Sequence, residues 1–372
     1  MKYLSQAADR IDSSEIRKLF DQAKHLKNPI DLSIGQPDFP VPEPVKEAMI
    51  KAIRDNKNSY TQTQGIQELR EAISEHWLGQ NVSIHPDQIL VSAGVAPLLF
   101  LLFEALFDEG DEIVILDPYF LIYDSLGKMK NLKARYLPED FDDSHIDELL
   151  ADTKFSPKAV IFSTPSNPTG KILSREQIMA LARYGAKSGA LLISDEIYQA
   201  FDYDGKFVST ASLVPEQTIT LGGFSKSHAM TGLRVGYMGV PAGLAHIFEK
   251  VAALQQYSVV CASQPAQWAS IEALKTPMDR EIALMKSRRD LVIRTLSGQV
   301  RYGAPDGAFY LFPEVPVDGK VFVEEALKRE LLVVPGYIFS HQNCHVRISY
   351  AQKDDVLSKG LEIFLDICNH FT

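Results

Sequence analysis

Between residues 88 and 240, short runs of β-branched and apolar residues alternate with longer helical patterns. The short runs cover residues 88–92, 112–116, 159–163, 191–194, 218–221 and 235–240. Helical patterns separate most of them, and residues 97–107 and 175–187 are clear examples. This alternation is typical of a mainly parallel sheet with helices on both faces. We therefore expect an α/β fold.

The chain is long enough to hold more than this sheet. It has 372 residues, of which 45% are apolar and 23% charged, and this is ordinary globular composition. At about 150 residues per domain we expect two domains. After residue 242 the sequence has long helical patterns at 245–257, 264–274 and 280–296, and then short strand and helix patterns at 307–312, 321–329, 345–349 and 354–368. These patterns predict a second, smaller α+β unit.

Residues 35–44 contain repeated prolines and form the clearest break in the pattern. Proline restricts its own backbone and that of the preceding residue, so this stretch predicts an extended, rigid connection. Directly after it, apolar residues recur at helical spacing. They predict a helix with one apolar face formed by Val45, Ala48, Met49 and Ile53.

The charge balance restricts the partners. Lys and Arg number 38 and Asp and Glu 48, which gives a net charge of −10. An acidic chain without a basic stripe is a poor binder of nucleic acid or of an anionic membrane, and we expect neither as a partner. Any anion must therefore be bound by a few local groups.

Cysteine usage and the chain start indicate a cytoplasmic location. The three cysteines, Cys261, Cys344 and Cys368, are widely spaced and form no Cys-x-x-Cys motif, which favours a reducing compartment. The first ten residues are polar and charged where a signal peptide has an apolar run. The most apolar stretch, residues 95–103, is too short to cross a bilayer.

Polar or helix-starting residues follow four of the expected strands. Ligands bind open α/β sheets at the carboxyl ends of the strands, so these residues are site candidates. They are Gly94, Val95 and Ala96 after the first run, Asn167 after the third, Asp195 and Tyr198 after the fourth, and Ser225 and Lys226 after the fifth, with Arg234 eight residues beyond Lys226. The set supplies an anion-binding helix start, a carboxylate, an amine and two donors for an oxygen atom.

One cofactor uses all of these groups together. Pyridoxal phosphate needs a lysine for its aldehyde, an acid against its pyridine nitrogen, donors for its ring hydroxyl and a phosphate site. The Gly-x-Gly-x-x-Gly fingerprint of a dinucleotide site is absent from the first strand end, and so is a phosphate-binding loop of the Gly-Lys-Ser/Thr type. We therefore expect pyridoxal 5'-phosphate.

The segment Ser225-Lys226-Ser227-His228-Ala229-Met230-Thr231-Gly232-Leu233-Arg234-Val235-Gly236-Tyr237 resembles the cofactor motif of the class I/II aminotransferases, the fold-type-I pyridoxal-phosphate enzymes. The resemblance extends from residues 35–39 to residues 345–349. It implies a large cofactor-binding domain of residues 44–284. It also implies a small domain built from both chain ends, residues 1–43 and 285–372.

The resemblance also implies roles for the cofactor site. Lys226 would hold the aldehyde and act as the general base, while Asp195 would pair with the pyridine nitrogen. Tyr198 and Asn167 would bind the ring oxygen, and Phe120 would stack on the ring. The phosphate would be bound by Gly94, Val95, Ala96, Ser225 and Arg234.

Substrate and subunit roles follow from the same resemblance. Arg347 would bind the substrate α-carboxylate bidentately, with Asn167 and the backbone of Gly35 beside it. Tyr60 would reach the phosphate of the neighbouring subunit, which implies a homodimer with shared active sites. The substrates would be an L-amino acid and a 2-oxo acid.

The helix start departs from the family pattern. The family usually has small or hydroxyl residues there, and its aspartate-specific branch often has a lysine. This chain has Val95, Ala96 and Pro97. Phosphate binding at this helix start is then left to backbone N–H groups, and the missing lysine favours a neutral or aromatic amino donor.

These features predict transamination in two half-reactions that follow a ping-pong mechanism. A β-carbon–sulfur lyase or a cyclopropane-forming synthase shares the motifs and stays open as an alternative. A regulatory binding protein that lost its chemistry is a minor alternative. Such chains commonly carry a DNA-binding extension, whereas only about 30 residues precede Gly35 here and the sequence has no basic stripe. His341, Cys344 and His345 lie close in sequence but lack a further pair of ligands, so we predict no metal site.

Overall fold

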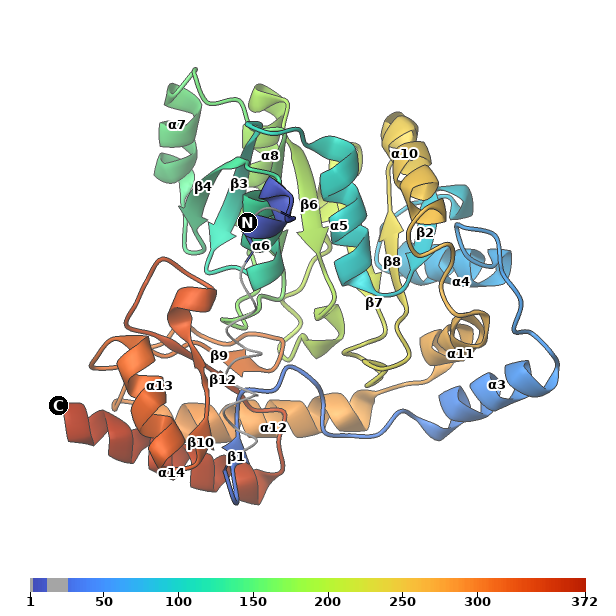
Figure 1. The fold of residues 1–372 in the computed structure, drawn as a ribbon. Coiled ribbons are helices and arrows are strands. Elements are labelled where there is room, and N and C mark those ends of the chain that lie inside the picture. The colour runs from blue at the N-terminus through green and yellow to red at the C-terminus, as the bar shows by residue number, and fades with distance from the viewer. Residues whose placement is uncertain (1–2, 12–25) are drawn as a thin grey trace.

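The computed structural model describes residues 3–11 and 26–372. Its largest element is a seven-stranded sheet with the order β2-β8-β7-β6-β5-β3-β4 (Figure 1). The strands are β2 (Ile89–Ser92), β3 (Glu112–Asp117), β4 (Lys133–Pro138), β5 (Ala159–Ser163), β6 (Leu191–Asp195), β7 (Thr218–Gly223) and β8 (Gly236–Gly239). Strands β4, β3, β5, β6 and β7 are parallel, whereas β8 runs antiparallel to both β7 and β2. The predicted mainly parallel sheet is confirmed.

Strand β4 is missing from the sequence prediction. It lies at the edge of the sheet and pairs with β3 alone. Its residues are half-buried or exposed, apart from Leu137. An edge strand need not be apolar on both faces, so β4 lacks the continuous apolar run that marks a central parallel strand.

Helices cover both faces of this sheet. In β3 and β5, alternate residues point to opposite faces. Ile113 and Ile161 pack in one core cluster with α5 (Val95–Leu106), α6 (Leu121–Met129) and α10 (Ala245–Gln256). Val114 and Val160 pack in another with α7 (Asp143–Ala151) and α8 (Arg175–Ser188). Burial on both faces explains why these strands are continuous apolar runs.

A third layer of helices packs beside β2 and β8. It contains α3 (Glu43–Arg54), α4 (Gln67–Leu78) and α11 (Gln264–Lys275). The predicted helix after the proline-rich stretch is therefore present, but its predicted apolar face is only partly buried. Val45 is fully buried, whereas Ile53 is 49% exposed.

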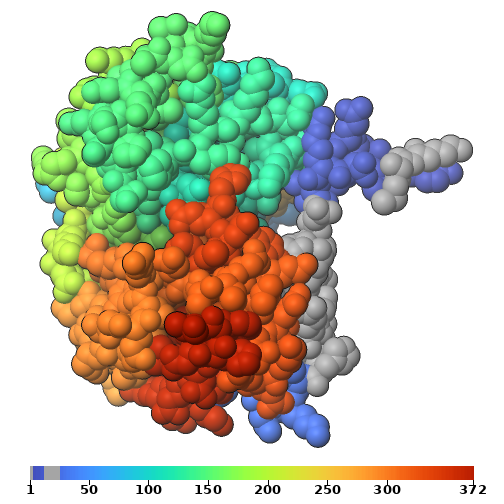
Figure 2. All heavy atoms as spheres, turned by 90° about the vertical axis from the view of Figure 1, so that its left-hand side faces the viewer, coloured from blue at the N-terminus to red at the C-terminus, as the bar shows by residue number. Residues whose placement is uncertain are grey.

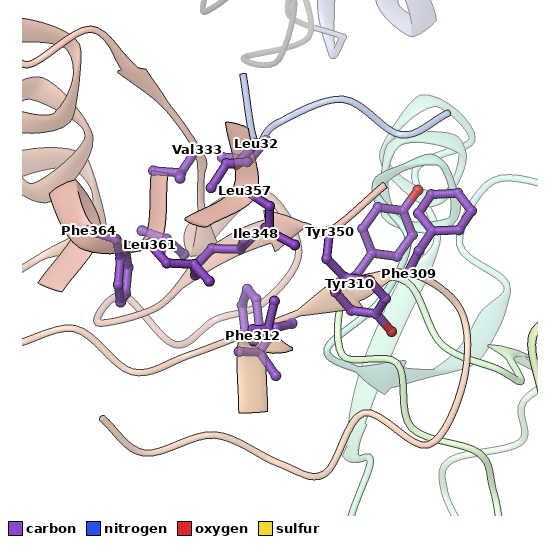
Figure 3. Packing of buried hydrophobic residues seen from close by; sticks show 14 of the residues in the cluster. Leu32, Phe309, Tyr310, Phe312, Val333, Ile348, Tyr350, Leu357, Leu361 and Phe364 are labelled. Carbon is purple, nitrogen blue, oxygen red and sulfur yellow. The ribbon is translucent and has the colours of Figure 1, made fainter. Parts of the chain in front are cut away.

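The C-terminal residues form a second unit below the main sheet (Figures 1 and 2). It contains the sheet β11-β12-β9, formed by Val334–Pro335, Val346–Ser349 and Tyr310–Leu311, and the helices α12 (Asp279–Leu296), α13 (Gly319–Lys328) and α14 (Asp354–Phe371). Its core packs Leu32 with Ile348, Leu361 and Phe364 (Figure 3). Within the described residues, the remaining helices of four or more residues are α1 (Gln6–Asp9) and α9 (Thr210–Leu213).

The N-terminal segment joins this C-terminal unit. Strand β1 (Ile30–Asp31) pairs in parallel with β10 (Leu331–Leu332), although the two are about 300 residues apart in the chain. This pairing supports the proposal that residues 1–43 and 285–372 form one small domain beside a large domain of residues 44–284. Helix α12 runs through the proposed boundary. Within residues 3–11 and 26–372, no helix has the length and apolarity needed to span a bilayer.

Candidate active site

A cavity of about 280 Å³ lies between the carboxyl ends of the central strands and the C-terminal unit. Strands β5 and β6, the segment after β7 and the start of α5 form one side of it, and β9 and β12 form the other. Of the residues predicted from the sequence, it brings together Gly35, Val95, Ala96, Phe120, Asn167, Asp195, Tyr198, Ser225, Lys226, Arg234 and Arg347.

Lys226 is the buried amine of this cavity. It follows β7 and a Gly-Gly pair, and its Nζ donates a hydrogen bond to the carbonyl of Gly35 at 2.6 Å. Burial and the nearby Arg347 and Arg234 lower the pKa of Lys226 to about 8, although Asp195 acts in the opposite direction. A lysine with this pKa is partly neutral near physiological pH, so its nitrogen can act as a nucleophile or a base.

Asp195 is the buried carboxylate and ends β6. Its Oδ2 accepts a hydrogen bond from the Tyr123 hydroxyl at 2.8 Å, and its Oδ1 accepts one from the Ile197 N–H at 3.2 Å. Burial raises the pKa of Asp195 to about 6, while the bond from Tyr123 lowers it. A buried carboxylate needs a cationic partner, and a protonated ring nitrogen would supply one.

One end of the cavity is built to bind an anion. Gly94 precedes α5 and has φ +101°, a backbone conformation that favours glycine. The helix begins at Val95, so the backbone N–H groups of Val95 and Ala96 lie in its first turn. A Cβ atom on Gly94 would collide with the guanidinium of Arg234. Arg234 donates to the carbonyls of Thr231 (2.9 Å) and Ala93 (3.1 Å), which hold its guanidinium at the helix start. A helix N-terminus and an arginine together form a phosphate site.

Arg347 lies at the opposite side, on the central strand of the small sheet. It is buried, and its guanidinium lies between the rings of Tyr310 and Phe339, at 4.6 Å and 4.7 Å from their centroids. Its Nη1 donates to Asn167 Oδ1 at 2.9 Å and its Nη2 to the carbonyl of Ser33 at 2.7 Å. An arginine presents five N–H donors, so these two bonds orient the fork and leave donors for a carboxylate.

Asn167 lies in the turn after β5, and a buried acid holds this turn. The Thr169 hydroxyl donates to the Glu139 carboxylate, at 2.7 Å to the nearer oxygen. Lys171 Nζ donates to the backbone carbonyl of Glu139 at 2.7 Å. The end of β4 thereby fixes the turn from which Asn167 meets Arg347.

Tyr198 and Phe120 also lie where the sequence predicts. The Tyr198 hydroxyl is 2.9 Å from the hydroxyl of Tyr310, and both side chains are buried. Phe120 is half-buried, precedes α6 and lines the cavity. Its ring therefore faces the space in which a planar ligand would lie.

Two of the predicted residues do not line the cavity. Gly94 directly precedes the lining residue Val95. The other is Tyr60, whose side chain is 84% exposed. The structure contains one subunit, so the predicted role of Tyr60 toward a neighbouring subunit stays a prediction.

Sequence reasoning missed several residues that shape the site. They are Ser33, Tyr123, Ser163, Ile197, Thr231 and Tyr310. Ser163 and Ile197 directly adjoin the segments that had been singled out, so a wider window around each strand end would have included them. Tyr123 lies three residues after the predicted Phe120, but neither it nor Tyr310 has a spacing that distinguishes it from an ordinary core residue.

His345, one of the three residues that lie close in sequence at 341–345, stacks on Phe312 with 5.0 Å between the ring centroids. In the described part of the chain, no group of three or more His, Cys, Asp or Glu side chains is arranged to bind a metal ion.

The fold and the site define an enzyme of the α/β class. Its cavity holds a buried lysine and a buried carboxylate, and an arginine lies at each end. Residues 27–363 match the family described as aminotransferase class I and II, so the chain belongs to this family and is an aminotransferase.

Relatives of this chain match it over nearly its full length. A probable aspartate aminotransferase of Methanocaldococcus jannaschii is 34% identical, with 98% of this chain and 99% of the relative covered. The aspartate aminotransferase of Thermotoga maritima is 32% identical, with 98% and 99% covered.

Solved structures agree with the predicted fold. Aspartate aminotransferase from Thermus thermophilus with maleate is 32% identical and superposes with a TM-score of 0.92, with 99% of this chain and 100% of that chain covered. A Methanococcus jannaschii protein, described as similar in its active site to kynurenine aminotransferases, is 32% identical, with a TM-score of 0.88 and 97% and 100% covered.

Proposed function

We propose that this aminotransferase uses pyridoxal 5'-phosphate to move an amino group from an L-amino acid to a 2-oxo acid in a ping-pong cycle. The observation that carries this proposal is the joint placement of Lys226, Asp195, Arg234 and Arg347 around one cavity. An amine, an acid and two separated anion sites are the groups that such a cofactor and an amino acid need together.

The residues of the cavity fit this cofactor. The space that Gly94 leaves beside the Arg234 guanidinium is a cradle that a Cβ atom would fill. Arg234, Ser225 and the N–H groups of Val95 and Ala96 would hold the phosphate. Asp195 would hold the pyridine nitrogen, and Tyr198 and Asn167 would donate to the ring oxygen. When bound, the cofactor supplies an aldehyde for the amino group and a ring that accepts electrons from the substrate Cα.

The protein's own groups perform the binding and proton transfer. Arg347 binds the α-carboxylate through the N–H donors that Asn167 and Ser33 do not use. Lys226 Nζ would accept the proton from the substrate Cα, because burial lowers its pKa to about 8 and makes it a base near neutrality. Phe120 and Tyr310 wall the cavity and limit access of water.

The lining favours a neutral or aromatic amino donor. Among the described lining residues the cations are Lys226, Arg234 and Arg347, and each already has a role. Among these described lining residues, no further lysine or arginine is therefore left for a second substrate carboxylate. Relatives are named for aspartate, so aspartate is the competing donor.

A half-reaction screen tests the proposal and the donor together. Each of the common amino acids is added to the cofactor-loaded protein, and the loss of the visible absorption of the lysine-bound cofactor is followed with the amount of 2-oxo acid formed. We expect neutral or aromatic amino acids to react fastest. Fast reaction restricted to aspartate would contradict the proposal of a neutral or aromatic amino donor. Release of ammonia with no 2-oxo acid acceptor present would favour the alternative function, a β-carbon–sulfur lyase.

We further propose a homodimer in which Tyr60 serves the partner subunit. Tyr60, Ile53 and Tyr257 are large apolar side chains that this subunit leaves 84%, 49% and 88% exposed. Exposed side chains of this size are available for a contact with a second subunit. Tyr60 is absent from the lining of its own cavity, and service to a second subunit is consistent with that position.

A further inference from the structure

Residues 33–39 have two contacts with the cations of the active site. Lys226 Nζ donates to the carbonyl of Gly35 at 2.6 Å, and Arg347 Nη2 donates to the carbonyl of Ser33 at 2.7 Å. Both cations therefore depend on the position of the same short stretch of backbone. This stretch follows β1 and lies outside any helix or strand.

The far end of this stretch is fixed by an ion pair. Arg288 of α12 binds Asp38 with both ends of its fork, Nη1 to Oδ1 at 2.6 Å and Nη2 to Oδ2 at 2.9 Å. The Arg288 side chain is 5% exposed and that of Asp38 20%, so the pair is largely shielded from water. Bidentate pairs of this kind fix direction as well as distance.

Little freedom separates this ion pair from the site. Three peptide bonds connect Gly35 to Asp38, so the two residues lie within about 11 Å of each other. Pro37 has a restricted φ and also restricts Gln36, which leaves few soft torsions between the pair and the carbonyl of Gly35. A displacement of Asp38 would therefore move the carbonyls that hold Lys226 and Arg347.

Arg288 also contacts the C-terminal helix. Its Nε donates to Asp354 of α14 at 3.0 Å, and Asp354 is 65% exposed. The buried guanidinium thus joins α12, α14 and the N-terminal stretch. The contact with the exposed Asp354 is expected to contribute little to holding Arg288 in place, because water and salt screen it.

We propose that Asp38 and Arg288 are a positioning pair that holds residues 33–39 against Lys226 and Arg347 and so sets the affinity for the substrate carboxylate. This inference rests on the proposed role of Arg347. Neither residue lines the cavity, so the pair acts only through the backbone carbonyls of Ser33 and Gly35.

The neighbouring residue provides a matched control. Arg289 also lies on α12, is 9% exposed and binds Asp204 through Nη1 and Oδ2 at 2.6 Å. This ion pair joins α12 to the segment after β6 and makes no hydrogen bond to residues 33–39. Asp204 also accepts from Lys286 Nζ of the same helix at 2.9 Å. Asp204→Asn therefore removes two ion pairs from α12 without releasing the stretch that holds the site.

The test compares Asp38→Asn and Asp204→Asn in the cofactor-loaded enzyme. We expect Asp38→Asn to raise KM for both the amino acid and the 2-oxo acid about tenfold, with a smaller change in kcat, because a carboxylate contact is weakened in ground state and transition state alike. Asp204→Asn should leave KM within about twofold of wild type. Asp38→Glu, which keeps the carboxylate, should recover most of the affinity.

Hydrogen exchange supplies a readout that is independent of turnover. In Asp38→Asn the backbone amides of residues 33–39, apart from Pro37, should exchange faster than in wild type, and in Asp204→Asn they should not. If Asp38→Asn does not fold, Arg288→Lys replaces it, since lysine keeps the charge but loses the fork. Unchanged KM in Asp38→Asn, or an equal rise in Asp204→Asn, would overturn the inference. A wild-type protein that transfers no amino group would instead contradict the proposed function.

Discussion

The hydroxyl of Tyr123 donates a hydrogen bond to Asp195 Oδ2 at 2.8 Å, and both side chains are buried. Tyr123 comes from the first turns of α6, which also begins directly after Phe120. The start of this helix thus supplies one side chain to the cavity wall and another to the buried carboxylate. Tyr123 stabilises the ionised form of Asp195, which burial disfavours.

Tyr123→Phe is expected to raise the pKa of Asp195 further above about 6, because the charged form loses a donor. If ionised Asp195 is needed for turnover, the acidic limb of the kcat/KM profile moves to higher pH, and activity at pH 6 falls about tenfold. The pH–rate profile measures this. Tyr184→Phe is the control, since the buried Tyr184 hydroxyl has no partner. An acidic limb that stays in place would show that Tyr123 does not tune Asp195.

Arg347→Lys is expected to raise KM for the amino donor about 100-fold, because lysine is a single point charge and cannot grip a carboxylate with a fork. The rings of Tyr310 and Phe339 that flank the guanidinium also lose their planar partner. Steady-state kinetics with donor and acceptor checks this. Arg183→Lys, on the exposed side of α8, should leave both KM values unchanged. A normal KM in Arg347→Lys would contradict the carboxylate role.

Glu196→Gln is expected to stabilise the protein at pH 8. Glu196 is buried, its Oε1 accepts from Ser194 and from the Thr210 N–H, and its Oε2 has no partner. Burial raises its pKa from 4.5 to about 7. A raised carboxyl pKa means that the folded protein binds the proton more tightly, so stability falls as pH rises from about 4.5 to 7, by about 3 kcal/mol.

Urea unfolding at pH 5 and pH 8 measures this effect. The variant should lose less stability than wild type between the two pH values. Glu249→Gln, which removes an exposed acid, should follow the wild-type curve. An identical loss in Glu196→Gln and wild type would show that Glu196 does not contribute to the pH dependence.

Mixing two inactive variants tests the shared active site. If Tyr60 serves the partner, a dimer of one Lys226→Ala subunit and one Tyr60→Ala subunit has one site with both changes and one site with neither. Random reassembly of an equal mixture should then restore up to about a quarter of wild-type activity, whereas each variant alone stays weak. No recovery after confirmed subunit exchange would place Tyr60 outside the partner's site.

Part of the site could be predicted because its residues are tied to strand ends. Lys226, Asp195 and Asn167 each follow a buried strand that the sequence marks by an apolar run. Parallel strands end at the same edge of a sheet, so three separate segments could be expected at one place. The motif around Lys226 then supplied the family, which the match over residues 27–363 confirms.

Other residues could not be predicted because packing alone brings them to the site. Tyr310 meets Tyr198 across 112 residues, and Tyr123 meets Asp195 across 72. Neither tyrosine has a spacing that differs from that of an ordinary core residue. The 49% exposure of Ile53 has a related reason: helical periodicity shows that a face is apolar but not what covers it.

The most direct test of the account is the Lys226→Ala variant in the amino-acid half-reaction. Wild-type protein loaded with pyridoxal phosphate should lose its visible absorption when a reactive amino acid is added and should release one 2-oxo acid per site. Lys226→Ala should lack the absorption of the lysine-bound cofactor. Its rate in the half-reaction should be at least about 100-fold lower than that of wild type. Wild-type absorption and rate in Lys226→Ala would contradict the assignment of this lysine and with it the proposed mechanism.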